Sequence, residues 1–298
     1  MAKRLQLAPA LAIALVLLVF AAPAAATPGH DRRIVGGQTT TIGSWPWQVA
    51  IVSAGSGSAY NRQFCGGSLL TPKIVVTAAH CVYGEDSRRF VSPSSIHVVT
   101  GRTKLSSTTG QEIRVAKIDV LTNSSGQVLY NPNTSSYDAE LLELSTPSTA
   151  TPVKLAGANE RDLWTGGRTA YVTGWGSTVP ASGGYPDALR VAQVRMVSDS
   201  QCPSYLGSLF KAATMVCAGA PPSRDTCDGD SGGPLVVPMA GGGYRLVGDT
   251  SFGLDEPCGR HPSAYGRLAA DPLRSLIRNK VLAVAHIDVV GSGARPPG

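Results

Sequence analysis

Short runs of β-prone residues alternate with turn-forming residues along most of this chain, and the alternation restricts the folds that it can adopt. The 298 residues include 34 glycines and 21 prolines, so regular structure is interrupted more often than in an average protein. This frequency argues against a helical bundle or coiled coil and favours an all-β sandwich or pair of barrels. Strands are predicted at residues 48–52, 73–78, 96–100, 112–120, 141–144, 169–173, 188–197, 235–237 and 244–248.

One segment near the end of the chain has helical rather than β spacing. Residues 271–285 place four apolar side chains on one helical face, at Leu273, Leu276, Ile277 and Val281. Asp271 and Pro272 are suited to the N-cap and the first helical position. We therefore expect a C-terminal helix over 271–286 and a flexible tail over 287–298.

Composition narrows the functional classes that remain. Hydrophobic residues make up 43% of the chain and charged residues 15%, so the chain can bury a core and is not of a disordered type. The formal charge is +6, but the first 33 residues account for three of those charges. The balance on the remainder is weak, and nucleic acid is not an expected partner.

The first residues have the pattern of a secretory signal peptide. Lys3 and Arg4 precede an apolar run at 7–20, which ends in small residues at 24–26. An uncleaved membrane anchor is the alternative, but Pro23 and the alanines favour cleavage after Ala26. We expect an exported, extracellular protein with no membrane association once the signal is removed.

Six cysteines follow in the exported part. An even number in such a chain predicts three disulfides, although counting leaves 15 possible connectivities for six cysteines. A zinc site is the alternative, but the chain has no Cys-x-x-Cys pair to support it. The cysteines are Cys65, Cys81, Cys202, Cys217, Cys227 and Cys258.

Three separated segments contain residue types suited to nucleophilic catalysis. Ser231 lies between glycines in a turn whose free N–H groups can surround a developing negative charge. His80 ends a strand-like run and is followed by Cys81, whose disulfide can hold the backbone in place. Asp138 opens an apolar stretch and completes a nucleophile, base and orienting carboxylate. Singly, each residue is also compatible with an ordinary turn or surface position.

Together, six motifs in this order resemble the trypsin and chymotrypsin family of serine proteases. They are Ile-Val-Gly-Gly at 34–37, Ser-Trp-Pro-Trp-Gln-Val at 44–49, Cys-Gly-Gly-Ser-Leu at 65–69, Thr-Ala-Ala-His-Cys at 77–81, Gly-Trp-Gly at 174–176 and Gly-Asp-Ser-Gly-Gly-Pro at 229–234. The resemblance covers nearly all of the exported chain. It implies an all-β fold of two packed six-stranded antiparallel barrels with a C-terminal helix, and the active site between the barrels.

The resemblance also implies a role for each chemical group. Ser231 would attack the scissile carbonyl, His80 would transfer the proton, and Asp138 would orient the imidazole. The N–H groups of Gly229 and Ser231 would form the oxyanion hole. The disulfides would be Cys65–Cys81, Cys202–Cys217 and Cys227–Cys258. Substrate would contact a pocket whose residues are Asp225, Thr226, Ser251, Phe252, Gly253 and Ser263.

By the same resemblance the chain would be made as an inactive precursor. Cleavage after Arg33 would free the amine of Ile34, which would pair with Asp230. Asp225 at the pocket floor would select Arg or Lys before the scissile bond. Ser263, at a position that is usually glycine in trypsins, would narrow the pocket and favour one of these two side chains.

The implied organisation is a signal peptide at 1–26, an activation propeptide at 27–33, barrels at 34–148 and 149–270, the helix and the tail. We expect a monomer whose partners are protein or peptide substrates, an activating protease and protein inhibitors.

No cofactor is expected, and calcium binding at 102–111 is doubtful because that loop has no carboxylate. Glu140 departs from the family's usual small apolar residue and needs a partner if it is buried.

Two alternatives remain to be compared with the structure. An α/β-hydrolase esterase would use the Gly-x-Ser-x-Gly pattern around Ser231 with Asp255 and His286. That turn requires a helix after the serine, whereas residues 234–238 are predicted to be a strand. A protease-like binding protein is the second alternative, but such proteins usually lack a residue of the triad, and here His80, Asp138 and Ser231 are all present.

Overall fold

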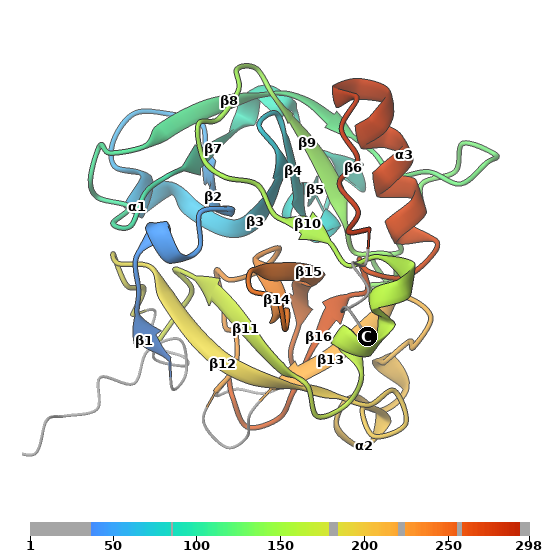
Figure 1. Cartoon of the computed structure of the whole chain (residues 1–298). Coiled ribbons are helices and arrows are strands. Elements are labelled where there is room, and N and C mark those ends of the chain that lie inside the picture. The colour runs from blue at the N-terminus through green and yellow to red at the C-terminus, as the bar shows by residue number, and fades with distance from the viewer. Residues whose placement is uncertain (1–36, 85, 179–183, 220–223, 255–257, 293–298) are drawn as a thin grey trace, which may run out of the picture. The chain divides into compact units, whose positions relative to one another are not determined.

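Antiparallel strands form two six-stranded barrels in this protein (Figure 1). The computed structural model describes residues 37–84, 86–178, 184–219, 224–254 and 258–292. The predicted signal peptide and the cleavage site at Arg33 and Ile34 lie outside these ranges. The fold class predicted from the sequence is confirmed.

The first barrel closes in the order β2-β3-β4-β9-β8-β7, with β7 paired back to β2. All neighbouring strands in it are antiparallel. Its strands are β2 (Gln48–Ser53), β3 (Gln63–Thr71), β4 (Ile74–Thr77), β7 (Ile96–Thr100), β8 (Gln111–Asp119) and β9 (Glu140–Leu144).

The second barrel follows the order β12-β11-β14-β15-β16-β13 and is closed by pairing of β12 with β13. Two short strands extend this sheet: β1 (Gln38–Thr39) pairs with β12, and β10 (Lys154–Leu155) pairs in parallel with β15. The barrel strands are β11 (Thr169–Gly174), β12 (Arg190–Val197), β13 (Met215–Gly219), β14 (Pro234–Pro238), β15 (Tyr244–Phe252) and β16 (Ser263–Gly266).

The remaining elements are short, except for one helix. A two-stranded ribbon is formed by β5 (Tyr83–Gly84) and β6 (Arg89–Phe90). The α-helices are α1 (Ala59–Arg62), α2 (Pro203–Leu206) and α3 (Leu273–Ala285), and the 3-10 helices are η1 (Ile42–Ser44), η2 (Ala79–Cys81), η3 (Pro93–Ser95), η4 (Ala158–Trp164) and η5 (Gly207–Leu209). Within the described ranges, no helix has the length and apolar character needed to cross a membrane.

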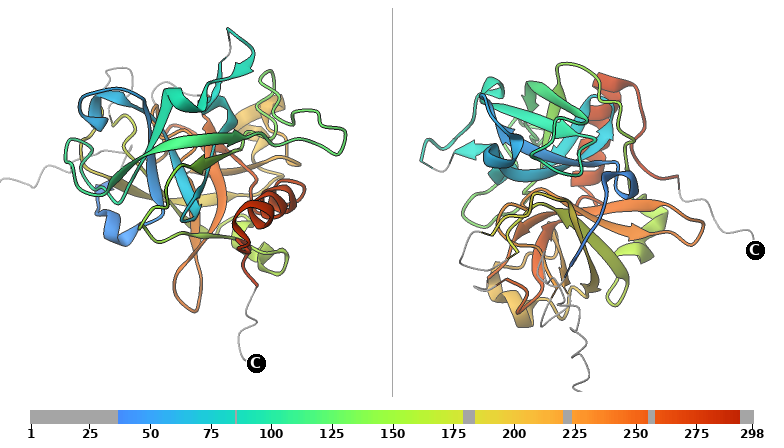
Figure 2. Two further views of the ribbon diagram at one scale, coloured as in Figure 1. Left: turned by 90° about the horizontal axis from the view of Figure 1, so that it is seen from above. Right: turned by 90° about the vertical axis from the view of Figure 1, so that its left-hand side faces the viewer.

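The C-terminal helix α3 lies beside the first barrel although it follows the second in sequence (Figure 2). Its buried side chains Leu273, Ile277 and Val281 belong to the same apolar cluster as the core of the first barrel. Burying each such side chain stabilises the fold by about 2 kcal/mol. The helix begins at Leu273, two residues after the predicted Asp271, because Pro272 occupies the N-cap.

The nine predicted strands are all present, with ends shifted by a few residues at most. Sequence reasoning missed the barrel strands β3, β13 and β16 and the short strands β1, β5, β6 and β10. In β3, Gly66 and Gly67 interrupt the apolar pattern, but the position of Gly67 is crowded: a Cβ there would lie 2.9 Å from the Val75 side chain on β4. The glycine therefore permits the close approach of two strands and does not mark a turn.

Close backbone contact joins the two barrels at the turn that contains Ser231. The Gly66 N–H on β3 donates to the Ser231 carbonyl, with an N···O distance of 2.7 Å. Gly232 has φ 77°, and a Cβ at that position would overlap the Thr77 hydroxyl oxygen. Only glycine fits this approach, so the turn is held directly against β3 and β4.

Candidate active site

His80 and Asp138 emerge side by side from neighbouring strands of the first barrel. Thr77 at the end of β4 pairs with Glu140 at the start of β9. Because the strands are antiparallel, the residues just beyond β4 and just before β9 meet at the same end of the sheet. His80 lies there in η2, and Asp138 lies two residues before Glu140.

Asp138 is 1% exposed, and its two carboxylate oxygens accept three hydrogen bonds. Oδ1 accepts from the His80 main-chain N–H at 2.9 Å, and Oδ2 lies 2.8 Å from His80 Nδ1. Ser251, on β15 of the second barrel, donates its hydroxyl to Oδ2 at 2.5 Å. A carboxylate only accepts, so the His80 proton lies on Nδ1, and Nε2 is left as the basic nitrogen.

Ser231 precedes β14 and reaches the same region from the second barrel. Its carbonyl oxygen lies 3.6 Å from Cys81 Sγ, and that sulfur lies 3.9 Å from His80 Nε2. Ser231 and His80 therefore contact the same sulfur atom. Together with the bond from Gly66, these contacts bring the three predicted catalytic residues into one region of the molecule.

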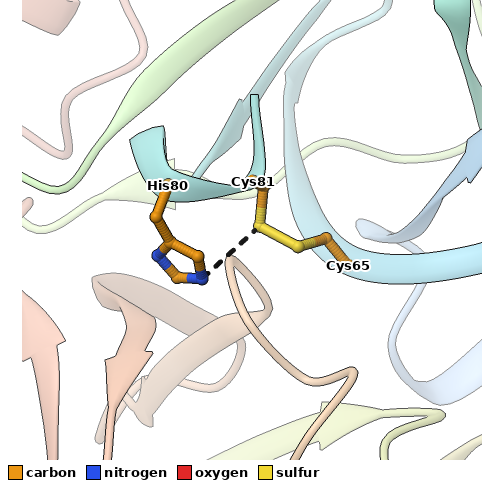
Figure 3. A group of neighbouring side chains, drawn as sticks. All are labelled: Cys65, His80 and Cys81. Carbon is orange, nitrogen blue, oxygen red and sulfur yellow. Dashed lines mark hydrogen bonds between the residues drawn. A yellow bond between two sulfur atoms is a disulfide. The ribbon is translucent and has the colours of Figure 1, made fainter. Parts of the chain in front are cut away.

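The sulfur between them belongs to a disulfide and not to a metal site. Cys65, His80 and Cys81 are close enough to suggest a metal-binding group (Figure 3). However, Cys65 and Cys81 are bonded to one another, so neither offers a thiolate. The bond ties η2 to β3 and holds the backbone beside His80. The other two disulfides are Cys202–Cys217 and Cys227–Cys258, which is the pairing that the resemblance implies.

Two unused backbone donors flank the Ser231 side chain. Among the described residues, none accepts a hydrogen bond from the N–H of Gly229 or of Ser231. Gly229 has φ 90°, and a Cβ there would lie 3.1 Å from Tyr185 Cε1. The Gln63 side chain donates to the Gly229 carbonyl at 2.8 Å, which fixes the peptide. Free donors in a fixed turn are suited to stabilising an oxyanion.

A cavity of about 230 Å³ opens beside Ser231. Asp225 is 1% exposed at this cavity, and its oxygens accept from Thr226 N at 2.8 Å, Ser263 Oγ at 2.6 Å and Tyr265 Oη at 3.2 Å. Burial raises the pKa of Asp225 to about 7, although these donors oppose the rise. The pocket thus presents a buried carboxylate that no cation in the described chain neutralises.

All six predicted pocket residues line this cavity, namely Asp225, Thr226, Ser251, Phe252, Gly253 and Ser263. Sequence reasoning missed Asp228 and His261, which line it as well. Asp228 adjoins the predicted oxyanion residue Gly229 in sequence, and this adjacency was the signal that could have identified it.

Asp230, the residue just before Ser231, is 1% exposed. Its Oδ1 accepts from Gly176 N at 2.8 Å and its Oδ2 from Cys227 N at 3.1 Å. Burial raises the pKa of Asp230 to about 7. No cationic side chain of the described residues pairs with it, and Ile34, its expected partner, lies outside them.

Comparison with known proteins identifies the family. A family model described as Trypsin matches residues 34–271. The chain belongs to the trypsin family. It is 37% identical over 264 residues to Trypsin beta of Drosophila erecta, which covers 86% of this chain and 92% of that protein. It is 36% identical over 240 residues to Trypsin of Saccharopolyspora erythraea, covering 80% and 94%. A solved structure that resembles this chain is that of neuropsin, a serine protease expressed in the limbic system of mouse brain. The TM-score is 0.65 and the sequence identity is 30%, and the match covers 82% of this chain and 98% of the neuropsin chain.

Membership of the trypsin family makes the chain a serine endopeptidase, and the fold excludes the esterase alternative. The strand β14 follows Ser231, where an esterase turn requires a helix. His286 caps the end of α3, and Asp255 lies outside the described residues. An esterase triad of Ser231, Asp255 and His286 is therefore not supported.

Two departures from the trypsin family pattern now have a structural account. Glu140 is fully buried, and only its Oε1 has a partner, the N–H of Leu121 at 2.9 Å. In the loop at 102–111, the Arg102 side chain is buried and donates to the Thr109 carbonyl at 2.7 Å. A guanidinium thus occupies the loop where calcium-binding trypsins carry acidic ligands.

Proposed function

We propose that this trypsin-family endopeptidase cleaves peptide bonds after Arg or Lys, with Ser231, His80 and Asp138 as its catalytic triad. The observation that carries the specificity is Asp225, a buried carboxyl group at a pocket beside Ser231 that has no cationic partner among the described residues. A desolvated carboxylate is stabilised most by a cation, and a guanidinium can bind both of its oxygens. A neutral side chain would leave the charge uncompensated.

The proposed reaction has two halves. The Ser231 hydroxyl oxygen attacks the scissile carbonyl carbon, and His80 Nε2 takes the hydroxyl proton. The carbonyl oxygen becomes an oxyanion that accepts from the N–H groups of Gly229 and Ser231. Collapse of this intermediate breaks the C–N bond, and His80 returns the proton to the leaving amine. Water then attacks the acyl-enzyme in the same way, releasing the acid and restoring the Ser231 hydroxyl.

Asp138 keeps one negative charge beside the imidazole throughout this cycle. Its bond to His80 Nδ1 at 2.8 Å directs Nε2 toward the serine side and stabilises the imidazolium that forms. The Ser251 hydroxyl and the His80 N–H hold the carboxylate in this orientation. No group has to reorganise during the proton transfer, which lowers the barrier.

The chain is proposed to be secreted as a zymogen and activated by cleavage after Arg33. The new Ile34 ammonium would pair with Asp230, whose buried carboxyl has no cation among the described residues. Pairing would fix the peptides of the turn that includes Gly229. We propose a monomer that acts on protein or peptide substrates and is subject to an activating protease and to protein inhibitors.

A matched set of peptides that differ only at the residue before the scissile bond tests this function. The cleaved chain is expected to hydrolyse Arg and Lys peptides at least 100-fold faster than Phe and Ala peptides, measured as kcat/KM. Asp225→Ser is expected to remove that preference, and Ser231→Ala is expected to abolish hydrolysis and labelling by a serine-directed covalent inhibitor. A Phe peptide that is cleaved faster than the Arg peptide would exclude Asp225 as the specificity residue.

A further inference from the structure

Asp249 is a buried carboxyl group on β15 that the proposed mechanism does not use. It is 0% exposed, and neither Oδ1 nor Oδ2 accepts a hydrogen bond from a described residue. An ionised carboxylate in such a place is very unfavourable, so the group is expected to keep its proton. Burial raises the pKa of Asp249 well above its ordinary value, and the negative charge of Asp138 adds to the rise.

Asp249 lies close in sequence to a residue that contacts Asp138. It lies two residues before Ser251, which donates to the Asp138 carboxylate. The pairing register of β15 and β16 shifts between Thr250 and Phe252, so strand alternation does not fix the direction of the Asp249 side chain.

Gly266 on β16 shows what Asp249 faces. Its Cα is the direct partner of Asp249 in the sheet. A Cβ on Gly266 would overlap Asp249 Oδ1 and would lie 3.2 Å from the main-chain oxygen of Asp138. The missing side chain leaves the space that the Asp249 carboxyl enters, and the same space is bordered by the Asp138 carbonyl. A protonated carboxyl can donate, and a carbonyl only accepts.

We propose that Asp249 is a positioning residue for the triad: as a neutral carboxylic acid it donates its O–H to the main-chain carbonyl of Asp138. The inference rests on the proposed function, because it assigns Asp249 a role through Asp138. Ser251 and His80 hold the carboxylate of Asp138, and Asp249 holds its peptide. The second barrel thereby orients Asp138 without adding a second negative charge beside His80.

The neighbouring charges are consistent with a single anion in this region. Among the described charged groups, Asp138 is the one whose charge contributes to the raised pKa of Asp249. Glu140, which reaches the vicinity of Asp138 from the first barrel, is also buried, and its pKa is raised to about 8. Of these three buried carboxyl groups, Asp138 is the one whose oxygens accept several hydrogen bonds, and such bonds favour the charged form of a carboxyl group.

Substitutions of similar size at position 249 show whether the side chain acts as a hydrogen-bond donor or as a negative charge. Asn and Thr at position 249 keep a donor without a charge, whereas Val has the shape of Thr and no donor. With the chain cleaved after Arg33, kcat and KM for an Arg peptide are measured from pH 5 to 10. Asp249→Asn and Asp249→Thr are expected to stay within about threefold of the wild-type kcat, and Asp249→Val to lose about tenfold in kcat with KM unchanged. Exposed Asp162→Asn is the surface control.

Each outcome has a definite consequence. The acid limb of the pH profile is expected to be the same in Asp249→Asn and wild type; a fall of about one unit in its apparent pKa would show that Asp249 is an anion and overturn the inference. Equal kcat in the Val and Thr variants would also overturn it. If Asp249→Val does not fold, the Asp249→Asn profile still decides. A wild-type chain that is not labelled at Ser231 would instead refute the proposed function.

Discussion

Glu140 allows a quantitative prediction about stability, because it is a buried acid with half of its hydrogen-bonding capacity unused. Its Oε1 accepts from Leu121 N, and its Oε2 has no partner. Burial raises its pKa from 4.5 to about 8; the Leu121 N–H and Lys280 oppose the rise, while Asp119 and Asp138 add to it. Lys280 on α3 is itself paired with Asp119 on β8, at 2.9 Å.

The sign of the effect follows from comparing the folded and unfolded chains. Below pH 4.5 the carboxyl is protonated in both, so it contributes no pH-dependent loss. Above that value the unfolded chain releases its proton while the folded chain retains it. The free energy of unfolding then falls by about 1.4 kcal/mol per pH unit until the folded-state pKa near 8 is reached. The loss is about 3 kcal/mol at pH 7 and about 4 kcal/mol at pH 8, and it levels off at about 5 kcal/mol above that pH.

Glu140→Gln removes this loss, because an amide does not titrate and its oxygen can still accept from Leu121 N. Urea unfolding of Ser231→Ala chains, which cannot digest themselves, is compared at pH 4 and pH 7 with and without the substitution. The stabilisation by Glu140→Gln is expected to be about 3 kcal/mol larger at pH 7 than at pH 4. Glu143→Gln, at a half-buried position on the same strand, is the control. A stabilisation that does not change between the two pH values would refute the reasoning.

Four further predictions concern the active site and its activation. Gly229→Ala is expected to lower kcat by about 10²–10³-fold, because a Cβ at φ 90° would press on Tyr185; an unchanged kcat in a steady-state assay would remove that N–H from the oxyanion hole. Arg33→Gln is expected to leave the chain inactive after incubation with an activating protease, and wild-type hydrolysis rates in this variant would show that cleavage is unnecessary. If the new terminal amine of the cleaved wild type pairs with Asp230 as proposed, its pKa is expected to rise above about 8, so activity is expected below the raised pKa and lost as pH rises through it. Ser251→Ala is expected to lower kcat about tenfold, because its hydroxyl donates to Asp138 at 2.5 Å; equal kcat would contradict that role.

Much of the fold and the site could be predicted because the signals are local. The nine predicted strands are bounded by turn residues, and each is long enough to show β-type composition. Ser231, His80 and Asp138 occur in short motifs whose types and order are distinctive. The structure places His80 and Asp138 within hydrogen-bond distance and Ser231 beside the same disulfide.

Other features could not be predicted, because they depend on residues distant in sequence. Asp249 occurs in a Gly-Asp-Thr-Ser segment that resembles a polar turn, yet it is fully buried on a central strand. Only Gly266 on the next strand leaves the space that its carboxyl enters. Strand β3 was missed for a similar reason, since Gly67 permits contact with Val75 on another strand.

The sequence by itself determined which chemical groups are present and the local conformations that carry them: the turn around Ser231, the cysteines beside His80 and Ser231, and the short strands. The tertiary structure decided which of these groups meet and which are ionised. Ionisation depends on water exclusion and on neighbouring charges, and both are set by packing between elements far apart in the chain. Asp138, Asp225 and Asp249 are the same residue type, but Asp138 accepts hydrogen bonds beside His80, Asp225 faces a pocket, and Asp249 accepts no hydrogen bond from any described residue.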